Sequence, residues 1–253
     1  MFTRVKTATE IEAMRTSGAM LASVLQHIKK QAAAGITGKD VAALAAKELK
    51  ALGGQPSFLG YQGFPDVICV SVNDEVVHGI PDDQPFKPGD LVSFDFGVTC
   101  QGMITDSAFS MFIGQSPSSD ATRLLETTEQ SLYAGMDTLK NGVRIGDIAA
   151  SIERVLKRGN LGIVRELVGH GVGHELHEDP NIPNYGIAGT GPKLSAGMTI
   201  ALEPMATLGA HAIGVDADKW TIRTRDHSLS AHFEHTVLIT ENGYEILTAR
   251  EEG

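Results

Sequence analysis

The chain has 253 residues, of which 42% are hydrophobic, and its formal net charge at pH 7 is −10. This length suits one large hydrophobic core, so we predict a single domain over residues 1–253. An acidic chain without clustered Lys and Arg does not suit broad binding to the phosphate backbone of DNA.

Two further features of composition concern the compartment. No apolar run reaches the roughly 18 residues of a membrane span, so we expect no membrane segment. The only two cysteines, Cys69 and Cys100, are too few for a disulfide-stapled extracellular scaffold. A reduced, cytoplasmic chain is therefore expected.

The first half begins with two predicted helices. Apolar residues recur at helical spacing over residues 10–31 and 39–52, and Thr9 with Glu12 has the spacing of a capping box. A predicted strand follows at residues 67–72. Helices are therefore expected before strands in this half.

Two aspartates lie on the next two predicted strands, Asp95 on 91–97 and Asp106 on 103–113. A hairpin loop at 99–102 would place them opposite each other, with Cβ atoms roughly 4.5–5.5 Å apart. Two ionised carboxylates this close repel unless a cation or a shared proton lies between them. A register shift of one residue would instead send one aspartate to the other face, where it could simply bond the turn.

The second half repeats the order of the first. Helices and then strands are predicted over residues 120–139, 146–158, 162–167, 198–204 and 230–240. Glu203 ends one of these strands, and Glu234 lies inside the last, where a glutamate is disfavoured without a partner. Helices segregated from antiparallel strands predict an α+β domain.

A glycine- and histidine-rich stretch at residues 167–180 contains His170, His174 and His177. Glycine at alternate positions over 169–173 disfavours a helix and predicts a strand that runs into a loop, packed closely against another segment. Imidazole is the commonest metal ligand in proteins. The alternative is a surface loop that happens to contain histidine, and carboxylates elsewhere decide between the two.

Five residues could form one oxygen-rich metal site: Asp95, Asp106, His170, Glu203 and Glu234. Such a set can surround two divalent cations, and its oxygen ligands suit Mn²⁺, Fe²⁺ or Co²⁺ rather than a cysteine-rich structural zinc site. Two metals about 3.5–4 Å apart can hold a bridging hydroxide and stabilise the oxyanion formed at a carbonyl. Hydrolysis of an amide near a free amine is the expected reaction.

Seven short strings then occur in order along the chain: NDEVVHGIP at 73–81, SFDFG at 93–97, TDS at 105–107, GHGVG at 169–173, HEDP at 177–180, LEPM at 202–205 and EHT at 234–236. Together they resemble the type I methionine aminopeptidases. The resemblance implies the pita-bread fold, a pseudo-twofold repeat of helices packed on a curved antiparallel sheet. It also implies a metal-dependent hydrolase that removes the N-terminal methionine when the next residue is small.

The resemblance assigns roles residue by residue. It implies that the metal ligands are Asp95, Asp106, His170, Glu203 and Glu234. Glu203 would also act as general base, and His78 and His177 would contact the scissile peptide and its oxyanion, although a lone histidine like His78 is more often structural. The methionine pocket would be lined by Phe58, Tyr61, Phe64, Cys69, Leu176 and Trp220. Some relatives have Cys in place of Phe58 and Phe in place of Leu176, which leaves the pocket shape open.

Further expectations follow from the same resemblance. A monovalent cation would bind near Asn73 and Ser230, and the partner would be the N-terminus of a peptide or nascent chain, with a transient ribosome contact and a monomeric state. Two relatives with other functions stay as alternatives: a prolidase or aminopeptidase P, which carries a larger N-terminal domain, and a catalytically inactive peptide-binding module, which loses metal ligands.

Overall fold

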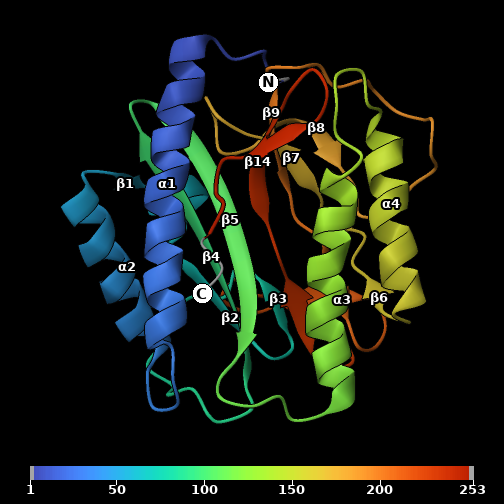
Figure 1. Ribbon diagram of the computed structural model, residues 1–253. Helices are drawn as coiled ribbons and strands as arrows, with labels where there is room; N and C mark the ends of the chain where they lie inside the picture. Colours follow the sequence, from blue (N-terminus) through green and yellow to red (C-terminus); the bar gives the residue numbers. More distant parts are fainter. Residues whose placement is uncertain (1–2, 251–253) are drawn as a thin grey trace.

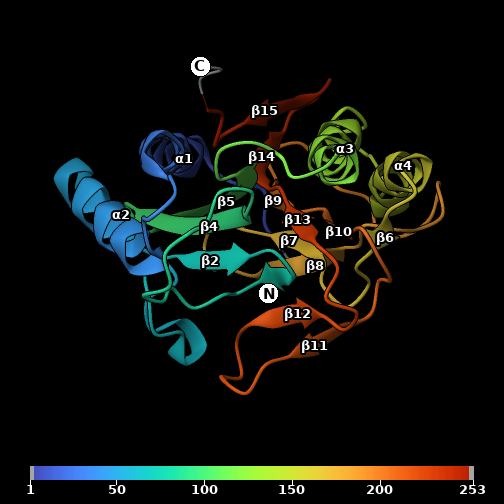
Figure 2. The same cartoon turned by 90° about the horizontal axis from the view of Figure 1, so that it is seen from below.

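Four long helices cover one side of a curved layer of antiparallel strands, two helices beside each half (Figures 1 and 2). The structure is a computed structural model and describes residues 3–250. The helices are α1 (Ala8–Gln31), α2 (Gly38–Leu52), α3 (Ser119–Met136) and α4 (Ile145–Arg158). Within the described range, no helix combines the length and apolar character needed to cross a membrane.

Four strands of the first half form one sheet. They are β1 (Gln55–Pro56), β2 (Cys69–Val72), β4 (Leu91–Cys100) and β5 (Met103–Phe112). The long strand β4 pairs with all three others in antiparallel fashion. A short 3-10 turn, Tyr61–Gly63, lies in the loop before β2.

Three further antiparallel sheets, in the orders β15-β14-β9-β7-β8, β13-β10-β6 and β11-β12-β3, contain the strands of the second half together with β3 of the first half. These strands are β3 (Glu75–Val77), β6 (Gly162–Ile163), β7 (Gly169–Gly171), β8 (Glu178–Ile182), β9 (Thr199–Leu202), β10 (Met205–Thr207), β11 (Ile213–Val215), β12 (Ile222–Thr224), β13 (Ser230–His232), β14 (His235–Ile239) and β15 (Tyr244–Ile246). The β11–β12 hairpin lies on the side of the strands away from the four helices (Figure 2). Its pairing with β3 connects the two halves.

The start of α1 differs from the prediction. The capping box is formed by Thr7 and Glu10, not by Thr9 and Glu12: Glu10 N donates to Thr7 Oγ1 at 3.3 Å, and Thr7 N donates to Glu10 Oε2 at 2.7 Å. Both pairs have the required spacing, but the other carboxylate oxygen of Glu10 bonds His174 at 2.7 Å. The helix therefore begins two residues earlier than predicted, and its capping-box residue Glu10 also contacts His174, which is distant in sequence.

The predicted hairpin register is also wrong. The turn lies at Gln101 and Gly102, both with positive φ, so Cys100 pairs with Met103. Asp95 then faces Ala108, and Asp106 faces Gly97. The register differs from the prediction by two residues, and because side chains alternate along a strand, both aspartates stay on one face as diagonal neighbours.

The predicted strand over 230–240 is interrupted at Phe233 and Glu234. There the backbone of Glu234 exchanges two hydrogen bonds with Ala108 of β5, at 3.0 and 3.3 Å. A second interruption separates β9 from β10 at Glu203 and Pro204. Both glutamates therefore lie where a strand is broken, with their side chains free of the regular alternation.

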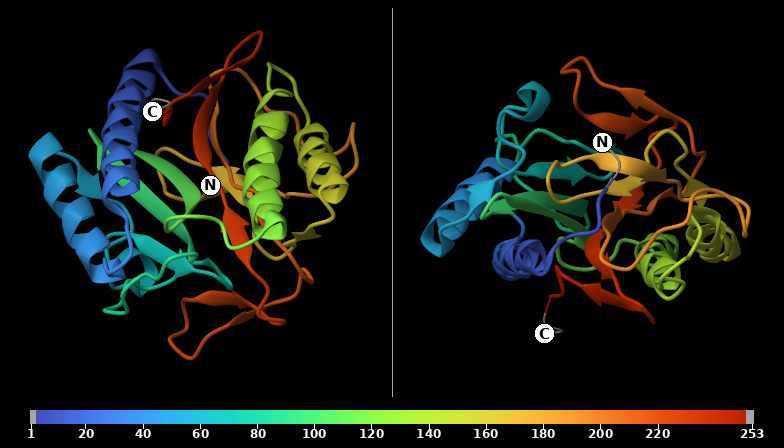
Figure 3. Two further views of the ribbon diagram at one scale, coloured as in Figure 1. Left: turned by 60° about the horizontal axis from the view of Figure 1, so that its bottom comes forward. Right: turned by 90° about the horizontal axis from the view of Figure 1, so that it is seen from above.

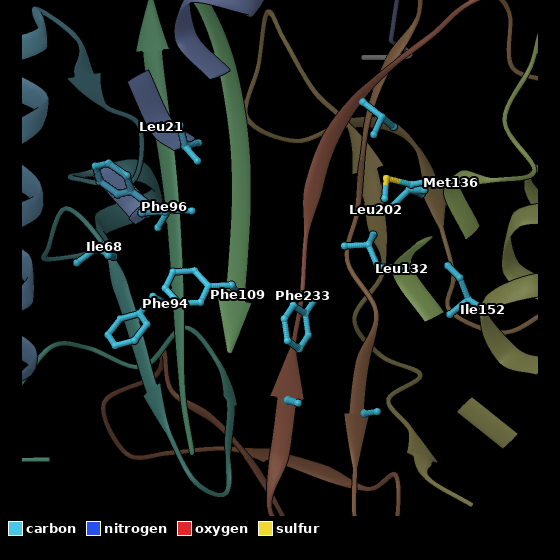
Figure 4. Close-up of a cluster of buried hydrophobic side chains, with 14 of the residues drawn as sticks. Leu21, Ile68, Phe94, Phe96, Phe109, Leu132, Met136, Ile152, Leu202 and Phe233 are labelled. Atoms are coloured by element: carbon cyan, nitrogen blue, oxygen red, sulfur yellow. The ribbon is translucent and has the colours of Figure 1, made fainter. Parts of the chain in front are cut away.

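Aromatic and aliphatic side chains fill the space between the helices and the strands (Figure 4). Phe94 is fully buried and lies 5.4 Å from Phe109 and 6.1 Å from Phe86 between ring centroids. Leu132 and Ile152 extend the same core under α3 and α4. Each such side chain contributes about 1.5–3 kcal/mol by burial, and the core thus gives the strands a rigid base.

Candidate metal centre and peptide pocket

A cavity of about 140 Å³ opens between the two halves of the strand layer. Its lining contains every catalytic, metal-ligand and methionine-pocket residue inferred from the sequence and adds Gln62: Phe58, Tyr61, Gln62, Phe64, Cys69, His78, Asp95, Asp106, His170, Leu176, His177, Glu203, Trp220 and Glu234. The volume is well below the roughly 300–1,000 Å³ of pockets for drug-sized ligands. A cavity of this size suits one amino-acid side chain and its attached polar groups.

The polar end of the cavity gathers ligand-type residues from distant parts of the chain. Asp95 and Asp106 come from β4 and β5, His170 from β7, and Glu203 and Glu234 from the two strand interruptions. All but Glu203 are buried. Asp106, His170 and Glu234 each place one ligand atom within 4.8 Å of the other two.

The buried carboxylates at the polar end of the cavity need a cation or protons to offset their negative charge. Burial raises the pKa of Asp95 to about 7, and burial together with the charges of Asp95 and Glu203 raises the pKa of Asp106 well above its usual range. Burial raises the pKa values of Glu203 and Glu234 in the same way. Among the described residues, Asp95 Oδ1, Asp106 Oδ1 and Glu234 Oε1 are buried without a hydrogen-bond partner. Such oxygens are costly unless a metal or a proton satisfies them, so this donor set fits divalent metal.

His170 is oriented as a ligand. Its Nδ1 lies 2.9 Å from the carbonyl oxygen of Gly171, which can only accept, so Nδ1 carries the proton. The lone pair is then on Nε2, which lies 3.4 Å from Glu203 Oε1. Burial lowers the pKa of His170 to about 3, so the ring is neutral. A neutral imidazole held by a backbone carbonyl is the usual form of a metal-binding histidine.

Backbone contacts hold the ligand strands together across the two halves. Thr236 Oγ1 donates to the carbonyl of Asp106 at 2.8 Å and accepts from the N–H of Asp106 at 2.8 Å. Ser107 Oγ donates to the carbonyl of Glu234 at 2.7 Å, and Arg250 donates to Ser107 Oγ at 2.8 Å. These bonds fix the backbones of Asp106 and Glu234 relative to each other.

Two histidines stand beside the ligands rather than among them. His177 Nδ1 lies 2.8 Å from the hydroxyl oxygen of Tyr61, and its ring centroid is 4.4 Å from that of His170. His78 has φ of 60°, and burial, followed by the charge of His177, lowers its pKa to about 4. Both rings line the cavity, where each can donate to a bound peptide.

The other end of the cavity is apolar. Phe64 lies edge-on to Trp220 at 5.2 Å and to Phe58 at 6.5 Å between ring centroids. A Cβ on Gly97 would come within 2.6 Å of the Phe58 ring, so glycine at that position lets the ring lie against β4. Phe58 and Leu176, the two departures from the related pattern, both lie in this apolar cluster.

Other sequence-derived candidates lie elsewhere. His174 does not line the cavity but bonds Glu10 of α1. The side-chain amide of Asn73 donates to Asp90 and accepts from the N–H of Leu91. The backbone carbonyl of Asn73 accepts from the N–H of Ser230 at 2.9 Å. Asn73 and Ser230 thus do adjoin each other, and cation binding there stays a prediction.

His232 also lies close to the candidate ligands, although no motif in the sequence predicts a role for it. This residue is buried, and neither ring nitrogen has a hydrogen-bond partner within the described part of the chain. Its Nε2 lies 3.9 Å from both Glu203 Oε2 and Glu234 Oε2. The alternation along 230–240 placed it on the same face as Glu234, which was the only signal for it.

The chain is similar to known proteins along nearly its whole length. Residues 12–241 match the metallopeptidase family M24. Methionine aminopeptidase 1 of Bacillus subtilis is 44% identical over 243 residues, covering 96% of this chain and 98% of the relative. The crystal structure of methionine aminopeptidase from Thermotoga maritima has a TM-score of 0.96 at 44% identity, covering 99% of this chain and all of that one.

A prolidase from Pyrococcus furiosus superimposes with a TM-score of 0.79 at 23% identity, and the match covers 98% of this chain but 66% of the prolidase. This likeness shows the shared fold alone. The pita-bread α+β fold expected from the sequence is confirmed by these structures.

Proposed function

Because the chain belongs to the metallopeptidase family M24, we propose that it removes the N-terminal methionine from peptides and nascent proteins when the next residue is small. Relatives named methionine aminopeptidase match at 40–44% identity over nearly the whole chain. The prolidase is more distant, so a prolidase or aminopeptidase P activity is not favoured. The observation that carries the proposal is one cavity with a carboxylate-rich end and an apolar, aromatic end.

Two divalent ions, Mn²⁺, Fe²⁺ or Co²⁺, would be held by Asp95, Asp106, His170, Glu203 and Glu234. When bound, such ions supply a nucleophilic hydroxide at neutral pH and stabilise charge on a carbonyl oxygen. Unpartnered buried oxygens on three of these residues support this assignment. A monovalent cation beside Asn73 and Ser230 is part of the same proposal.

Other residues of the cavity would bind the methionine side chain, stabilise the oxyanion and transfer the proton. The apolar end, with Phe64 and Trp220, takes the flexible thioether of methionine, for which contacts between sulfur and aromatic rings are favourable. His78 and His177 donate hydrogen bonds to the scissile peptide as its carbonyl oxygen becomes negative. Glu203, whose Oε1 lies 3.4 Å from His170 Nε2, accepts the proton of the attacking water and passes it to the leaving amine.

The direct test compares three peptides, Met-Ala-Ser, Met-Leu-Ser and Leu-Ala-Ser, with protein loaded with Mn²⁺, Co²⁺ or Fe²⁺. We expect cleavage of the first alone. Chelator-stripped protein should be inactive and should regain activity on addition of metal. Equal rates on all three peptides, or full activity of protein shown by elemental analysis to be metal-free, would contradict the proposal.

A further inference from the structure

The segment before α1 lies across the histidine-rich stretch, as the right-hand view of Figure 3 shows. Thr3 N donates to the carbonyl of Asp179 at 2.5 Å, and Lys6 N donates to the carbonyl of Gly197 at 2.7 Å. Thr3 Oγ1 also donates to the carbonyl of Thr199. Residues 3–6 therefore form a strap, bound at both ends to the half of the protein that supplies His170 and His177.

The strap accounts for two of the three alternating glycines of the histidine-rich stretch, Gly171 and Gly173. A Cβ on Gly171 would lie 2.7 Å from Thr3 Cβ, and a Cβ on Gly173 would lie 2.6 Å from Lys6 Cε. Both distances are well inside van der Waals contact, so any side chain at either position would displace the strap. The glycines thus leave room for Thr3 and Lys6 to lie directly on the backbone.

A buried ion pair connects the strap to the loop that leads to His177. Lys6 Nζ lies 3.1 Å from Glu178 Oε2, and the two side chains are 0% and 3% exposed. The other carboxylate oxygen, Glu178 Oε1, accepts from the N–H groups of His174 and Glu175 at 2.7 and 3.1 Å. The Glu178 carboxylate therefore binds the backbone of loop 174–178 through one oxygen and pairs with the Lys6 ammonium group through the other.

We propose that Lys6 is a positioning residue for His177. Lys6 pairs with the Glu178 carboxylate, and that carboxylate fixes the backbone of loop 174–178. His177 belongs to this loop and directly precedes Glu178. The inference rests on the proposed function, in which His177 contacts the substrate. Lys6 does not line the cavity, so it acts on the reaction only through this loop.

The positive charge of Lys6 is needed to neutralise the buried Glu178 carboxylate. Replacing the lysine alone would leave the Glu178 carboxylate buried without a counter-charge, and breaking one side of a buried pair is far more disruptive than removing both charges. With Lys6 gone, the carboxylate would be drawn toward water, and the loop with its two N–H bonds would follow. Loss of loop position should then appear in kcat, because His177 acts on the developing oxyanion.

The test uses four variants of the metal-loaded protein on Met-Ala-Ser, with kcat, KM and bound metal measured for each. Lys6→Met removes the counter-charge, and Lys6→Met/Glu178→Gln removes both charges but keeps an oxygen that can accept from the loop. Lys6→Met/Glu178→Ala removes that acceptor as well. The control is Lys39→Met, the same change at an exposed lysine that pairs with Asp66 at 2.7 Å.

We expect Lys6→Met to lower kcat by about 10–100-fold, less than the 10²–10³-fold for loss of an oxyanion donor itself. KM and metal content should stay near wild type. The glutamine double variant should recover most of kcat, the alanine double variant should not, and Lys39→Met should match wild type. Should Lys6→Met not fold, the two double variants still decide the question, because neither buries a lone charge.

Equal kcat values for the glutamine and alanine double variants would overturn the inference, as would an unchanged kcat in well-folded Lys6→Met. A loss of metal in parallel with kcat would also overturn it, since the strap would then act on the ligands and not on His177. Failure of the proposed function appears separately, as wild-type protein that does not cleave Met-Ala-Ser. In that event the same four variants are compared on whichever peptide the wild type cleaves.

Discussion

Replacing His177 by alanine should separate substrate contact from metal binding. The ring lies beside His170, 4.4 Å between centroids, yet the atoms that meet within 4.8 Å as a potential metal site come from Asp106, His170 and Glu234. Nδ1 of His177 is engaged by the Tyr61 hydroxyl, which leaves Nε2 for the substrate. His177→Ala should therefore keep its metal while losing activity, whereas His170→Ala should lose both.

The size of the loss follows from the hydrogen bonds removed. Loss of one oxyanion donor lowers kcat/KM by about 10²–10³, or about 2.7–4 kcal/mol in the transition state. Tyr61→Phe keeps the imidazole and removes one bond that orients it, so about 1 kcal/mol, or roughly fivefold, is expected. His174→Ala, whose ring faces Glu10 and not the cavity, should have a smaller effect than His177→Ala.

The assays are calorimetric titration of stripped protein with Mn²⁺ or Co²⁺ and steady-state kinetics on Met-Ala-Ser. His78→Ala should behave like His177→Ala, because both rings line the cavity and neither belongs to the metal cluster. If His177→Ala loses metal while His170→Ala retains it, the division of roles between these two histidines is wrong even if the enzyme class stands.

Three further predictions concern the pocket, the acid response and the core. Trp220→Ala should raise KM for Met-Ala-Ser more than it lowers kcat, because Trp220 contacts Phe64 at the apolar end; a fall in kcat alone would contradict this. The hydrogen bond from His174 lowers the pKa of Glu10 to about 2, below its unfolded value, so its stabilisation is present above about pH 4.5 and lost as pH falls toward 2. Thermal unfolding from pH 5 to pH 2.5 should therefore vary less with pH in Glu10→Gln, and an unchanged slope would refute the link. Phe94→Ala should lower the free energy of unfolding by about 3–5 kcal/mol in urea titration, and a loss under 1 kcal/mol would show that the ring is not packed as described.

The site was largely predictable because its residues are chemically conspicuous. Asp95, Asp106 and Glu234 lie in strand-like sequence where an unpaired carboxylate is costly, and the surrounding strings resemble one family. In the folded chain these carboxylates come together in one cavity, which is the context that local sequence alone does not contain. His232 was missed because a buried histidine in an alternating strand has no sequence signature that separates packing from function.

The remaining errors have a common cause, which is contact between segments distant in sequence. Local spacing could not choose between Thr7 and Thr9 as the cap, whereas the hydrogen bond from His174 to Glu10 exists only in the folded chain. The turn at Gln101 and Gly102 shifted the hairpin register by two residues without changing the face of either aspartate. The bonds between Glu234 and Ala108 interrupt a strand that alternates well in isolation. Helix and strand propensities depend on the local sequence of a segment, whereas these three features depend on the segments that pack against it.

The proposed metal ligands come from both halves of the chain, and this has a consequence for folding. Asp95 and Asp106 belong to one half and His170, Glu203 and Glu234 to the other, so the unfolded chain offers no comparable set of ligands. Divalent metal should then bind the native state selectively and act as a reversible cross-link. At a free metal concentration 100-fold above Kd, the gain in unfolding free energy is about 2.7 kcal/mol. The unfolding temperature should consequently climb with the logarithm of metal concentration, and chelators should hasten proteolysis of the chain.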